Sequence, residues 1–278
     1  MSVAPLTIGV CSWSMQVKSI TELESLCDRT GIHAVQIACG DPHHASWTDD
    51  DMESAAKAAN FTLLSTMIGF PGEDYTTPLT IKQTGGFGDP ARNEERLEIF
   101  KWAVQRTANL GLDQITSHGG FIPEIGEDGR SAFLDTLGMA AAIAAEKGVT
   151  LCLETGQESA ELLKATLDEL KLDNLKVNFD PANMLMYDMG DPIKAVAILA
   201  EHISSVHCKD ANAPTTPGDW GEEVPLGEGQ VNIKQFIQAL IKEGYTGPLV
   251  IEREVGNQEE RIESIITGKA QIELALAN

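Results

Sequence analysis

Lysine and arginine are scarce in this 278-residue chain. There are 20 of them against 42 aspartates and glutamates, and the formal net charge is −22. A polypeptide this acidic repels a phosphate backbone, so the composition argues against nucleic-acid binding. The same field attracts cations, although acidic residues also serve simply to keep a protein in solution. The charge therefore excludes one class of partner and keeps metal ions among the candidates.

A long uninterrupted apolar segment is also missing. The longest apolar-rich run, GMAAAIAAEKGV, is too short and too interrupted to span a bilayer. The first residues, MSVAPLTIGVCSWSMQ, lack the basic start and the long apolar core of a secretory signal. These two absences predict a protein without a membrane partner that is located in the cytoplasm.

Cysteine is sparse and unpaired in its spacing. The number of cysteines is odd and none forms a Cys-x-x-Cys pair, which predicts reduced thiols in a cytoplasmic protein. They are Cys11, Cys27, Cys39, Cys152 and Cys208. Linker-like and low-complexity segments are absent too, and 42% of the residues are hydrophobic, which is enough for one large core. We expect a single domain that covers residues 1–278.

The chain does contain one repeated pattern. A short apolar run ends in polar or reactive residues, and a stretch with apolar residues at three-to-four spacing follows it. The runs lie at residues 6–14, 34–40, 61–70, 114–120, 150–156, 175–183, 203–211 and 248–254. Eight strands that alternate with about eight helices predict a single (β/α)8 TIM barrel of class α/β. The alternative, a dinucleotide-binding open sheet, should show GxGxxG after its first strand, and GVCSWS does not match.

Two of the connections are unusually long. Residues 71–93, rich in glycine, proline and threonine, follow the third predicted strand, and residues 212–230 follow the seventh. Connections of this kind surround the active site of a β/α barrel. Structureless segments of such length are usually lids, binding loops or disordered segments. We expect residues 71–93 to be irregular and to border the site, and the sequence does not decide whether they close as a lid.

Four consecutive strands end in side chains that can bind a metal ion. They are Glu154, Asp180, His207 and Glu252. Strand alternation places all four on the barrel axis and the large apolar neighbours on the opposite face. A single acid at a strand end is more often a helix N-cap or a solvated group. Three converging carboxylates, however, repel one another unless a cation lies between them. Three oxygen donors and one imidazole suit Mn²⁺, Mg²⁺ or Co²⁺, so we predict one divalent metal ion at the barrel mouth.

At these residues the sequence resembles the xylose-isomerase-like family of sugar isomerases and epimerases, over essentially the whole chain. The matching pieces are LCLETG, VNFDPAN, SSVHCKDA and PLGEGQVNIKQFIQALIKEGYTGPLVIERE. The resemblance implies that Glu154, Asp180, His207 and Glu252 ligate the metal. It also implies that Glu154 and Glu252 are catalytic and exchange protons with the substrate carbon, one on each face. The implied activity is a metal-dependent carbohydrate isomerase or epimerase that acts on a ketose or keto-sugar through an enediolate.

Two departures from the family pattern leave the reaction open. Many members have Asp-x-x-His where this chain has Asp180 followed by Asn183, which can bond a sugar oxygen but cannot relay protons. The second strand has Gln36 where a glutamate is common. One alternative is a metal-dependent dehydratase or lyase on a keto-sugar or keto-inositol. Another is a non-catalytic sugar-binding barrel. The endonuclease branch has a basic surface, which the acidic charge of this chain contradicts.

Four residues are candidates for contact with substrate. His118 ends the fourth strand and either touches the substrate or packs under the third connection. Lys209 returns to the same side as His207 and could bind a substrate oxygen. Trp13 could stack on a sugar face or be a plain rim aromatic. Asn183 could bond a sugar hydroxyl.

Alternation assigns the remaining reactive residues elsewhere. Cys208 and Asp210 face the helices or the loop, so Cys208 is expected to be a packing thiol. Arg253 points away from Glu252 and is expected to be structural. The adjacent His43 and His44 are expected to be exposed in a loop.

The charge of the seventh connection bears on the substrate. Residues 212–230 contain several acids, and no lysine or arginine lies between Lys209 and Lys234. Barrel enzymes often hold phosphate groups with the loops after strands seven and eight, and this loop would repel one. We therefore expect a small-molecule carbohydrate substrate without a phosphate: a neutral sugar, keto-sugar or cyclitol. Assembly into a homo-oligomer stays open.

Overall fold

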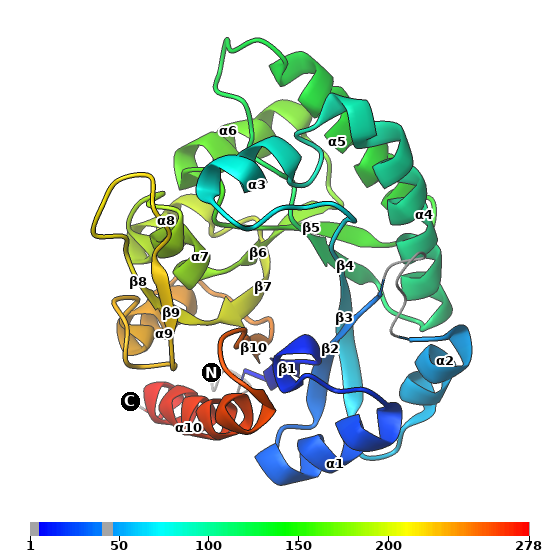
Figure 1. Ribbon diagram of the computed structural model, residues 1–278, viewed down its shortest axis with the longest axis vertical. Helices are drawn as coiled ribbons and strands as arrows, with labels where there is room; N and C mark the ends of the chain where they lie inside the picture. The colour runs from blue at the N-terminus through cyan, green and yellow to red at the C-terminus, as the bar shows by residue number, and fades with distance from the viewer. Residues whose placement is uncertain (1–5, 41–46, 278) are drawn as a thin grey trace.

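Eight parallel strands close into a barrel in the order β1-β10-β7-β6-β5-β4-β3-β2 (Figure 1). The structure is a computed structural model that describes residues 6–40 and 47–277, so His43 and His44 lie outside the described residues. The predicted (β/α)8 TIM barrel is confirmed, and each predicted apolar run contains one barrel strand. The strands are β1 (Ile8–Cys11), β2 (Ala34–Ala38), β3 (Thr62–Ile68), β4 (Gln114–Ser117), β5 (Thr150–Glu154), β6 (Leu175–Phe179), β7 (Ile203–Cys208) and β10 (Leu249–Ile251).

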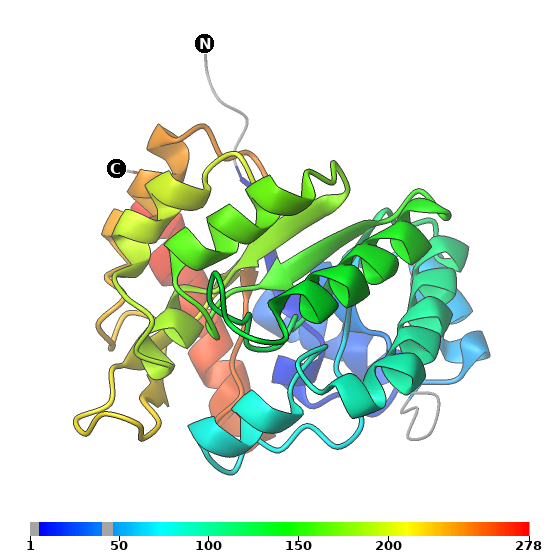
Figure 2. The same cartoon turned by 90° about the horizontal axis from the view of Figure 1, so that it is seen from above.

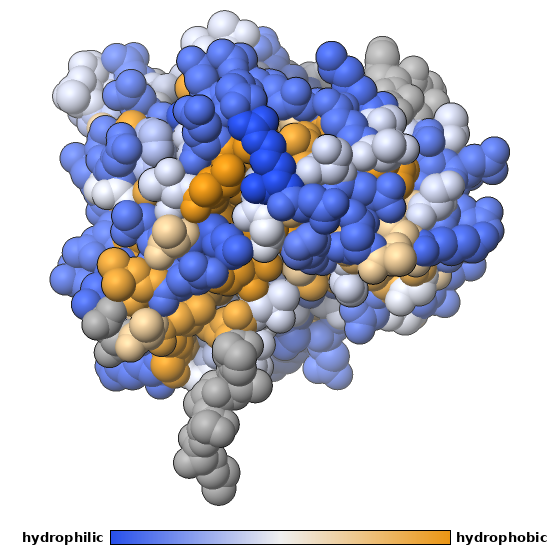
Figure 3. Space-filling model, turned by 90° about the horizontal axis from the view of Figure 1, so that it is seen from below, coloured by the Kyte–Doolittle hydropathy of each residue, from blue (hydrophilic) through white to orange (hydrophobic). Residues whose placement is uncertain are grey.

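Helices cover the outside of this barrel. Several begin at a side-chain cap, for example Ser19, Ser159 and Asn257, whose oxygens accept a backbone N–H of the first turn. The outer helices are α1 (Ile20–Thr30), α2 (Asp49–Lys57), α4 (Asn93–Asn109), α5 (Arg130–Ala145), α6 (Ala160–Leu170), α8 (Pro192–Leu199), α9 (Ile233–Lys242) and α10 (Gln258–Leu276). Figure 3 shows the face over α1 and α10, where polar side chains cover most of the surface and apolar residues show between them.

Alternation along the strands divides the core from the barrel interior. Val177 and Phe179 of β6 are fully buried, and the Phe179 ring lies 5.5 Å from the ring of Phe236 on α9. Asn178, between them, pairs with Glu154 of β5 in the parallel register. The strands β5, β6, β7 and β10 are consecutive neighbours in the closed sheet. Residues at their carboxyl ends are therefore placed side by side at one mouth.

Residues 71–93 form ordered structure, so the expectation of an irregular segment is wrong. They contain the helix α3 (Pro78–Thr84) and a short 3-10 helix η2 (Pro90–Arg92). A capping box starts α3, because Thr77 and Thr80 each accept the other's backbone N–H, and Pro78 occupies the first turn. Figure 2 shows α3 and the loop between β8 and β9 projecting from the same end of the barrel.

Side chains below α3 tie this connection down. The fully buried Arg96 of α4 donates to the carbonyls of Thr84 and Gly86. The carboxylate of Glu73 accepts the backbone N–H groups of Phe70 at 3.1 Å and Gly86 at 2.8 Å. Gly86 has φ of 50°, and a Cβ there would lie 2.1 Å from the nitrogen of Gly120. The chain therefore fixes this connection with a buried cation, a carboxylate and a close glycine contact.

The connection after β7 forms a two-stranded hairpin. The strands β8 (Asp210–Asn212) and β9 (Glu222–Val224) pair in antiparallel fashion. The Asp210 carboxylate accepts the backbone N–H groups of Ala211, Gly227, Gly229 and Val231 at 2.9 to 3.0 Å. A Cβ on Gly229 would lie 2.3 Å from the Asp210 carboxylate. The sequence G-x-G thus lets the backbone close around Asp210, and this side chain faces the loop, as alternation predicts.

The small helix α7 (Pro181–Met186) follows β6 directly and lies on the mouth side. The five cysteines are free and buried, and Cys208 packs within the hydrophobic core, as alternation predicts. Within the described residues, no helix combines the length and the apolar character that a membrane span requires.

Candidate metal centre and active site

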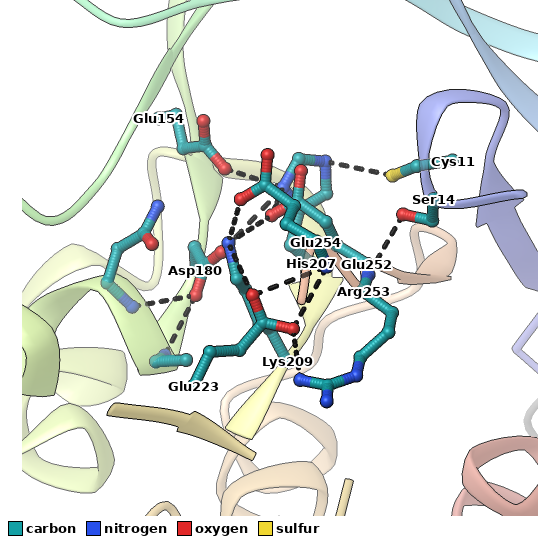
Figure 4. Close-up of polar contacts among 12 residues, drawn as sticks. Cys11, Ser14, Glu154, Asp180, His207, Lys209, Glu223, Glu252, Arg253 and Glu254 are labelled. Carbon is teal, nitrogen blue, oxygen red and sulfur yellow. Dashed lines mark hydrogen bonds and ion pairs between the residues drawn. The ribbon is translucent and has the colours of Figure 1, made fainter. Parts of the chain in front are cut away.

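The four predicted metal ligands converge at the mouth of the barrel (Figure 4). Glu154, Asp180, His207 and Glu252 are all buried, and each offers a ligand atom within 4.8 Å of the others. The Nδ1 atom of His207 lies 2.6 Å from Glu154 Oε1, 3.5 Å from Glu252 Oε2 and 3.9 Å from Asp180 Oδ2. Residues up to 98 positions apart in the sequence thus bring their ligand atoms together in one buried cluster.

Asp180 serves the fold with one oxygen and faces the cluster with the other. Its Oδ1 accepts the backbone N–H groups of Ala182 at 2.8 Å and Asn183 at 3.0 Å, which caps α7. Its Oδ2 is buried and has no hydrogen-bond partner among the described residues. A buried, unpaired carboxylate oxygen is costly, so it marks the position where a partner is expected. Asp180 can therefore be both an N-cap, through Oδ1, and a candidate metal ligand, through Oδ2.

The electrostatics of the three carboxylates fit a cation. Burial raises the pKa of Asp180 well above its usual value, and Glu252 and Glu154 raise it further. Burial acts in the same direction on Glu154, but His118 and His207 outweigh it and lower the pKa of Glu154 to about 2. Lys209 and His207 likewise overcome burial and hold the pKa of Glu252 well below its usual range. A divalent cation would let the third carboxylate ionise as well, so the residues present fit such an ion.

Gln36 orients the imidazole of His207. Its Oε1 lies 2.6 Å from His207 Nε2, and its own Nε2 donates to Thr116 Oγ1 at 3.1 Å. The Cys11 thiol donates to the same Oε1 at 3.6 Å. Because the amide nitrogen is engaged by Thr116, the amide oxygen must face His207 and accept the Nε2 proton. This arrangement leaves Nδ1, the nitrogen that faces the carboxylates, available as a ligand.

Glu252 is held from two sides. The Trp13 indole Nε1–H donates to its Oε1 at 2.8 Å, and Lys209 Nζ donates to its Oε2 at 3.0 Å. Lys209 also donates to Glu254 at 2.5 Å. Lys209 is buried, and these carboxylates overcome the effect of burial and raise its pKa well above the usual value. The structure thus places Lys209 behind Glu252, where ion pairs engage it, and not in the wall of the cavity.

His118 and Asn183 do reach the cavity wall. His118 Nε2 lies 3.0 Å from Glu154 Oε2. Burial alone would lower the pKa of His118, but Glu154 outweighs it and raises it to about 9. His118 is therefore a charged partner of Glu154 near neutral pH.

The mouth opens into a cavity of about 610 Å³. Its described lining contains no lysine or arginine. It is formed by Trp13, Ala38, Met67, Gly69, Glu73, Tyr75, His118, Glu154, Asn183, Met186, Tyr187, Trp220, Gly221, Glu223, Glu252, Glu254 and Val255. Trp13 lines it while bonded to Glu252, so it is a rim aromatic with a specific polar contact.

The sequence reasoning missed several of these lining residues. Glu254 could have been found, because it lies two residues after Glu252 and alternation returns it to the same face. Tyr75, Tyr187 and Trp220 lie outside the barrel strands, where no periodicity marks them. A further missed residue is Glu158, which follows β5 and is buried; burial raises its pKa to about 8. A polar run such as TGQE gives no signal that its last carboxylate is buried.

Comparison with known families agrees with this geometry. The model of the xylose isomerase-like TIM barrel family matches residues 25–269. The chain belongs to this family. Arg253 of this xylose isomerase-like barrel, expected to be structural, donates to Glu223 at 2.6 Å and lies outside the lining of the cavity.

Three known proteins are similar to this chain. L-ribulose-5-phosphate 3-epimerase from Escherichia coli is 29% identical over 173 residues, which are 60% of this chain and 59% of that protein. The chain thus matches less than two thirds of the length of this curated relative. The structure of a xylose isomerase domain protein from Planctomyces limnophilus is 28% identical, covers 99% of both chains and has a TM-score of 0.85. A D-psicose 3-epimerase from Clostridium cellulolyticum H10, crystallised with D-tagatose, is 14% identical, covers 98% of this chain and 99% of that one, and shares the fold with a TM-score of 0.71.

Proposed function

We propose that this protein is a divalent-metal-dependent carbohydrate isomerase or epimerase that acts on a ketose or keto-sugar. The observation that carries the proposal is the convergence of four buried ligand side chains at the base of an open cavity. The epimerase activity named for the Escherichia coli relative supports the isomerase class.

Glu154, Asp180, His207 and Glu252 would hold one Mn²⁺, Mg²⁺ or Co²⁺ ion, since oxygen donors with one imidazole suit these cations. When bound, such an ion supplies positive charge and polarises a substrate carbonyl as a Lewis acid. Asp180 is held rigidly by its cap on α7, and His207 by Gln36. These two residues therefore position the site without taking part in proton transfer.

Glu154 and Glu252 are the proton-transfer pair in this proposal. One carboxylate removes the proton from the carbon next to the carbonyl, and the other returns a proton to the opposite face of the resulting enediolate. Both glutamates line the cavity, and both have pKa values held low, so the first is ionised and free to take the proton from carbon. The second must take up a proton from water before it can return one to the enediolate. Their partners differ, because His118 contacts Glu154 whereas Lys209 and Trp13 contact Glu252.

Exchange with solvent tests the reaction directly. Purified protein loaded with Mn²⁺ is incubated with a panel of ketoses in deuterated water, and proton NMR records the products. Deuterium at a stereocentre without loss of water supports an epimerase. Glu154→Gln and Glu252→Gln should each lower turnover at least about a hundredfold, because each removes one acid–base group. Glu98→Gln, at an exposed position of α4, is the matched control and should keep full activity. Unchanged turnover in both site variants would contradict the mechanism.

The substrate is proposed to be unphosphorylated. The cavity is lined by five glutamates, Glu73, Glu154, Glu223, Glu252 and Glu254, and by no lysine or arginine among its described lining residues. A phosphate dianion would find no free cationic side chain there, because Arg253 and Lys209 lie outside the lining and are engaged by Glu223 and Glu254. Inhibition by matched free and phosphorylated ketoses measures this preference. We expect the free sugars to inhibit more strongly, and tighter inhibition by the phosphates would show that the substrate is a sugar phosphate.

One observation favours a dehydratase as the second candidate. His118 lines the cavity with its Nε2 atom 3.0 Å from Glu154 Oε2, a position from which a protonated imidazole could donate a proton to a departing hydroxyl group. The same NMR experiment separates the two reactions, because a dehydratase releases water from a keto-sugar or keto-inositol. Tight sugar binding with metal present but no exchange and no elimination would point to the non-catalytic sugar-binding barrel.

A further inference from the structure

The cavity is larger than a single sugar at the metal centre requires. Its volume of about 610 Å³ lies in the middle of the range, about 300–1,000 Å³, of pockets that enclose drug-sized ligands. The four carboxylate and imidazole ligands meet within 4.8 Å, so the reacting carbon occupies only the base of this space. The remaining volume needs an occupant or stays filled with water.

One wall of this space is aromatic. The ring of Trp220 lies 4.8 Å from that of Tyr187 at an interplanar angle of 66°, and Tyr187 lies 5.7 Å from Phe121 at 76°. Met186, next to Tyr187, adds a thioether to the lining. Tyr187 and Trp220 are half-buried, so each has one packed side and one side available to a ligand. Edge-to-face packing of this kind holds the rings in fixed orientations.

The fold holds Trp220 in this position through its neighbour. The backbone N–H of Gly221 donates to the carbonyl of Met186 at 3.0 Å and joins the hairpin to α7. A Cβ on Gly221 would lie 2.5 Å from the carbonyl oxygen of Asn212 and 2.7 Å from the Cα of Met186. Only glycine permits this approach, so the contact between the hairpin and α7 requires a glycine directly after Trp220. The aromatic wall is therefore a built part of the cavity.

The polar groups beside this wall suit hydroxyl groups. Glu223 is paired with Arg253 at 2.6 Å, and Glu254 with Lys209 at 2.5 Å, so both charges are compensated while both side chains line the cavity. The Tyr187 hydroxyl accepts from Gln157 Nε2 at 3.4 Å and keeps its own proton to donate. Apolar ring faces next to compensated carboxylates are the surroundings that a neutral sugar ring requires, with its C–H faces and its hydroxyl edge.

We propose that Trp220, Tyr187 and Met186 form a second subsite that holds a further ring of the substrate. The substrate class is then a ketose or keto-sugar that carries a glycosidic substituent, and not a free monosaccharide. This inference rests on the proposed function, which places the reacting sugar at the metal centre. The second ring lies against the aromatic wall and contributes affinity without taking part in proton transfer.

Binding measurements test the subsite separately from turnover. Isothermal titration of the Mn²⁺-loaded protein compares D-fructose with the ketose disaccharides maltulose, lactulose and turanose. We expect at least one disaccharide to bind about fivefold to tenfold more tightly than D-fructose, the gain typical of an added aromatic contact. Trp220→Ala and Trp220→Leu should remove this advantage and leave D-fructose binding within about twofold, whereas Trp220→Phe should keep most of it.

Two controls keep the result interpretable. Ile125→Ala changes an exposed apolar residue outside the cavity lining and should alter neither affinity. Thermal melting of each variant verifies the fold, and Trp220→Leu keeps apolar bulk if Trp220→Ala loosens the hairpin. Equal binding of D-fructose and every disaccharide, equal weakening of both by the Trp220 variants, or no binding by any of these sugars would overturn the subsite. Failure of the proposed function has a different signature, namely no metal uptake and no deuterium exchange with any ketose.

Discussion

The two glutamates at the barrel mouth have the same carboxylate chemistry, but different side chains contact them. Glu154 faces two histidines, His118 at 3.0 Å and His207 at 2.6 Å. Glu252 faces a buried lysine at 3.0 Å and an indole N–H at 2.8 Å. The pKa of His118 is raised to about 9 and that of Lys209 well above its usual value, so as the pH rises His118 loses its charge before Lys209 does. The barrel thus places a titratable partner on one side of the site and a permanent cation on the other.

Lys209→Met breaks the permanent side and has the largest expected effect on stability. The variant leaves the buried carboxylate of Glu252 without its cation and removes the ion-pair partner of the exposed Glu254. Loss of one partner of a buried ion pair costs about 3–5 kcal/mol, and urea unfolding measures it. The control Lys164→Met removes an ion pair with Asp168 at the surface and should cost less than about 1 kcal/mol. Similar losses in the two variants would show that Lys209 is not electrostatically essential.

His118→Asn breaks the titratable side and should cost less, about 1.5–3 kcal/mol, because His207 still faces Glu154. The pKa of His118 is raised to about 9 in the folded protein, above the ordinary histidine value of 6.5. Its charge therefore stabilises the fold fully below about pH 6.5, and this contribution is lost as the pH rises through about 9. Urea unfolding of both proteins in EDTA should show a difference that shrinks between pH 6 and pH 10. The Lys209→Met difference should persist over that range, and a pH-independent His118 difference would contradict the comparison.

Gln36→Leu has the smallest expected effect, a loss of metal affinity. It tests His207, the residue that both Glu154 and Glu252 contact. The variant removes the acceptor at 2.6 Å that holds the proton on His207 Nε2. Loss of such an outer hydrogen bond typically weakens metal binding about tenfold, and titration with Mn²⁺ measures the affinity directly. Gln36→Glu restores an acceptor and should recover the affinity. An unchanged affinity in Gln36→Leu would mean that packing alone orients His207.

The sequence alone predicted the strands and the four converging side chains because alternation and repetition carry that information. Glu154 and Asp180 could be placed on one face from their neighbours in the chain. The support of these residues could not be predicted, since the contacts of Lys209 with Glu254 and of Trp13 with Glu252 join segments far apart in the chain. Thr77 and Pro78 did carry the signal of a helix start, but the surrounding glycines and threonines concealed it.

The aromatic wall was the hardest part to foresee. Tyr187 follows a helix of six residues, and Trp220 lies in the connection between two three-residue strands. Segments this short have no periodicity from which the direction of a side chain can be read. Their positions depend on one backbone contact between Gly221 and Met186. The only sign of this contact in the sequence is the glycine itself.

The Asp210 carboxylate divides the connection after β7 into two parts with different freedom to change. It fixes the backbone at Gly227, Gly229 and Val231, so length changes there would disturb the neighbours of His207 and Lys209. Residues 213–219, between the two hairpin strands, carry no such restraint from Asp210. Insertions and exchanged loops are tolerated best at such tips. The hairpin tip is therefore the place where selection or engineering can change the length of this connection while Glu154, Asp180, His207 and Glu252 keep their positions.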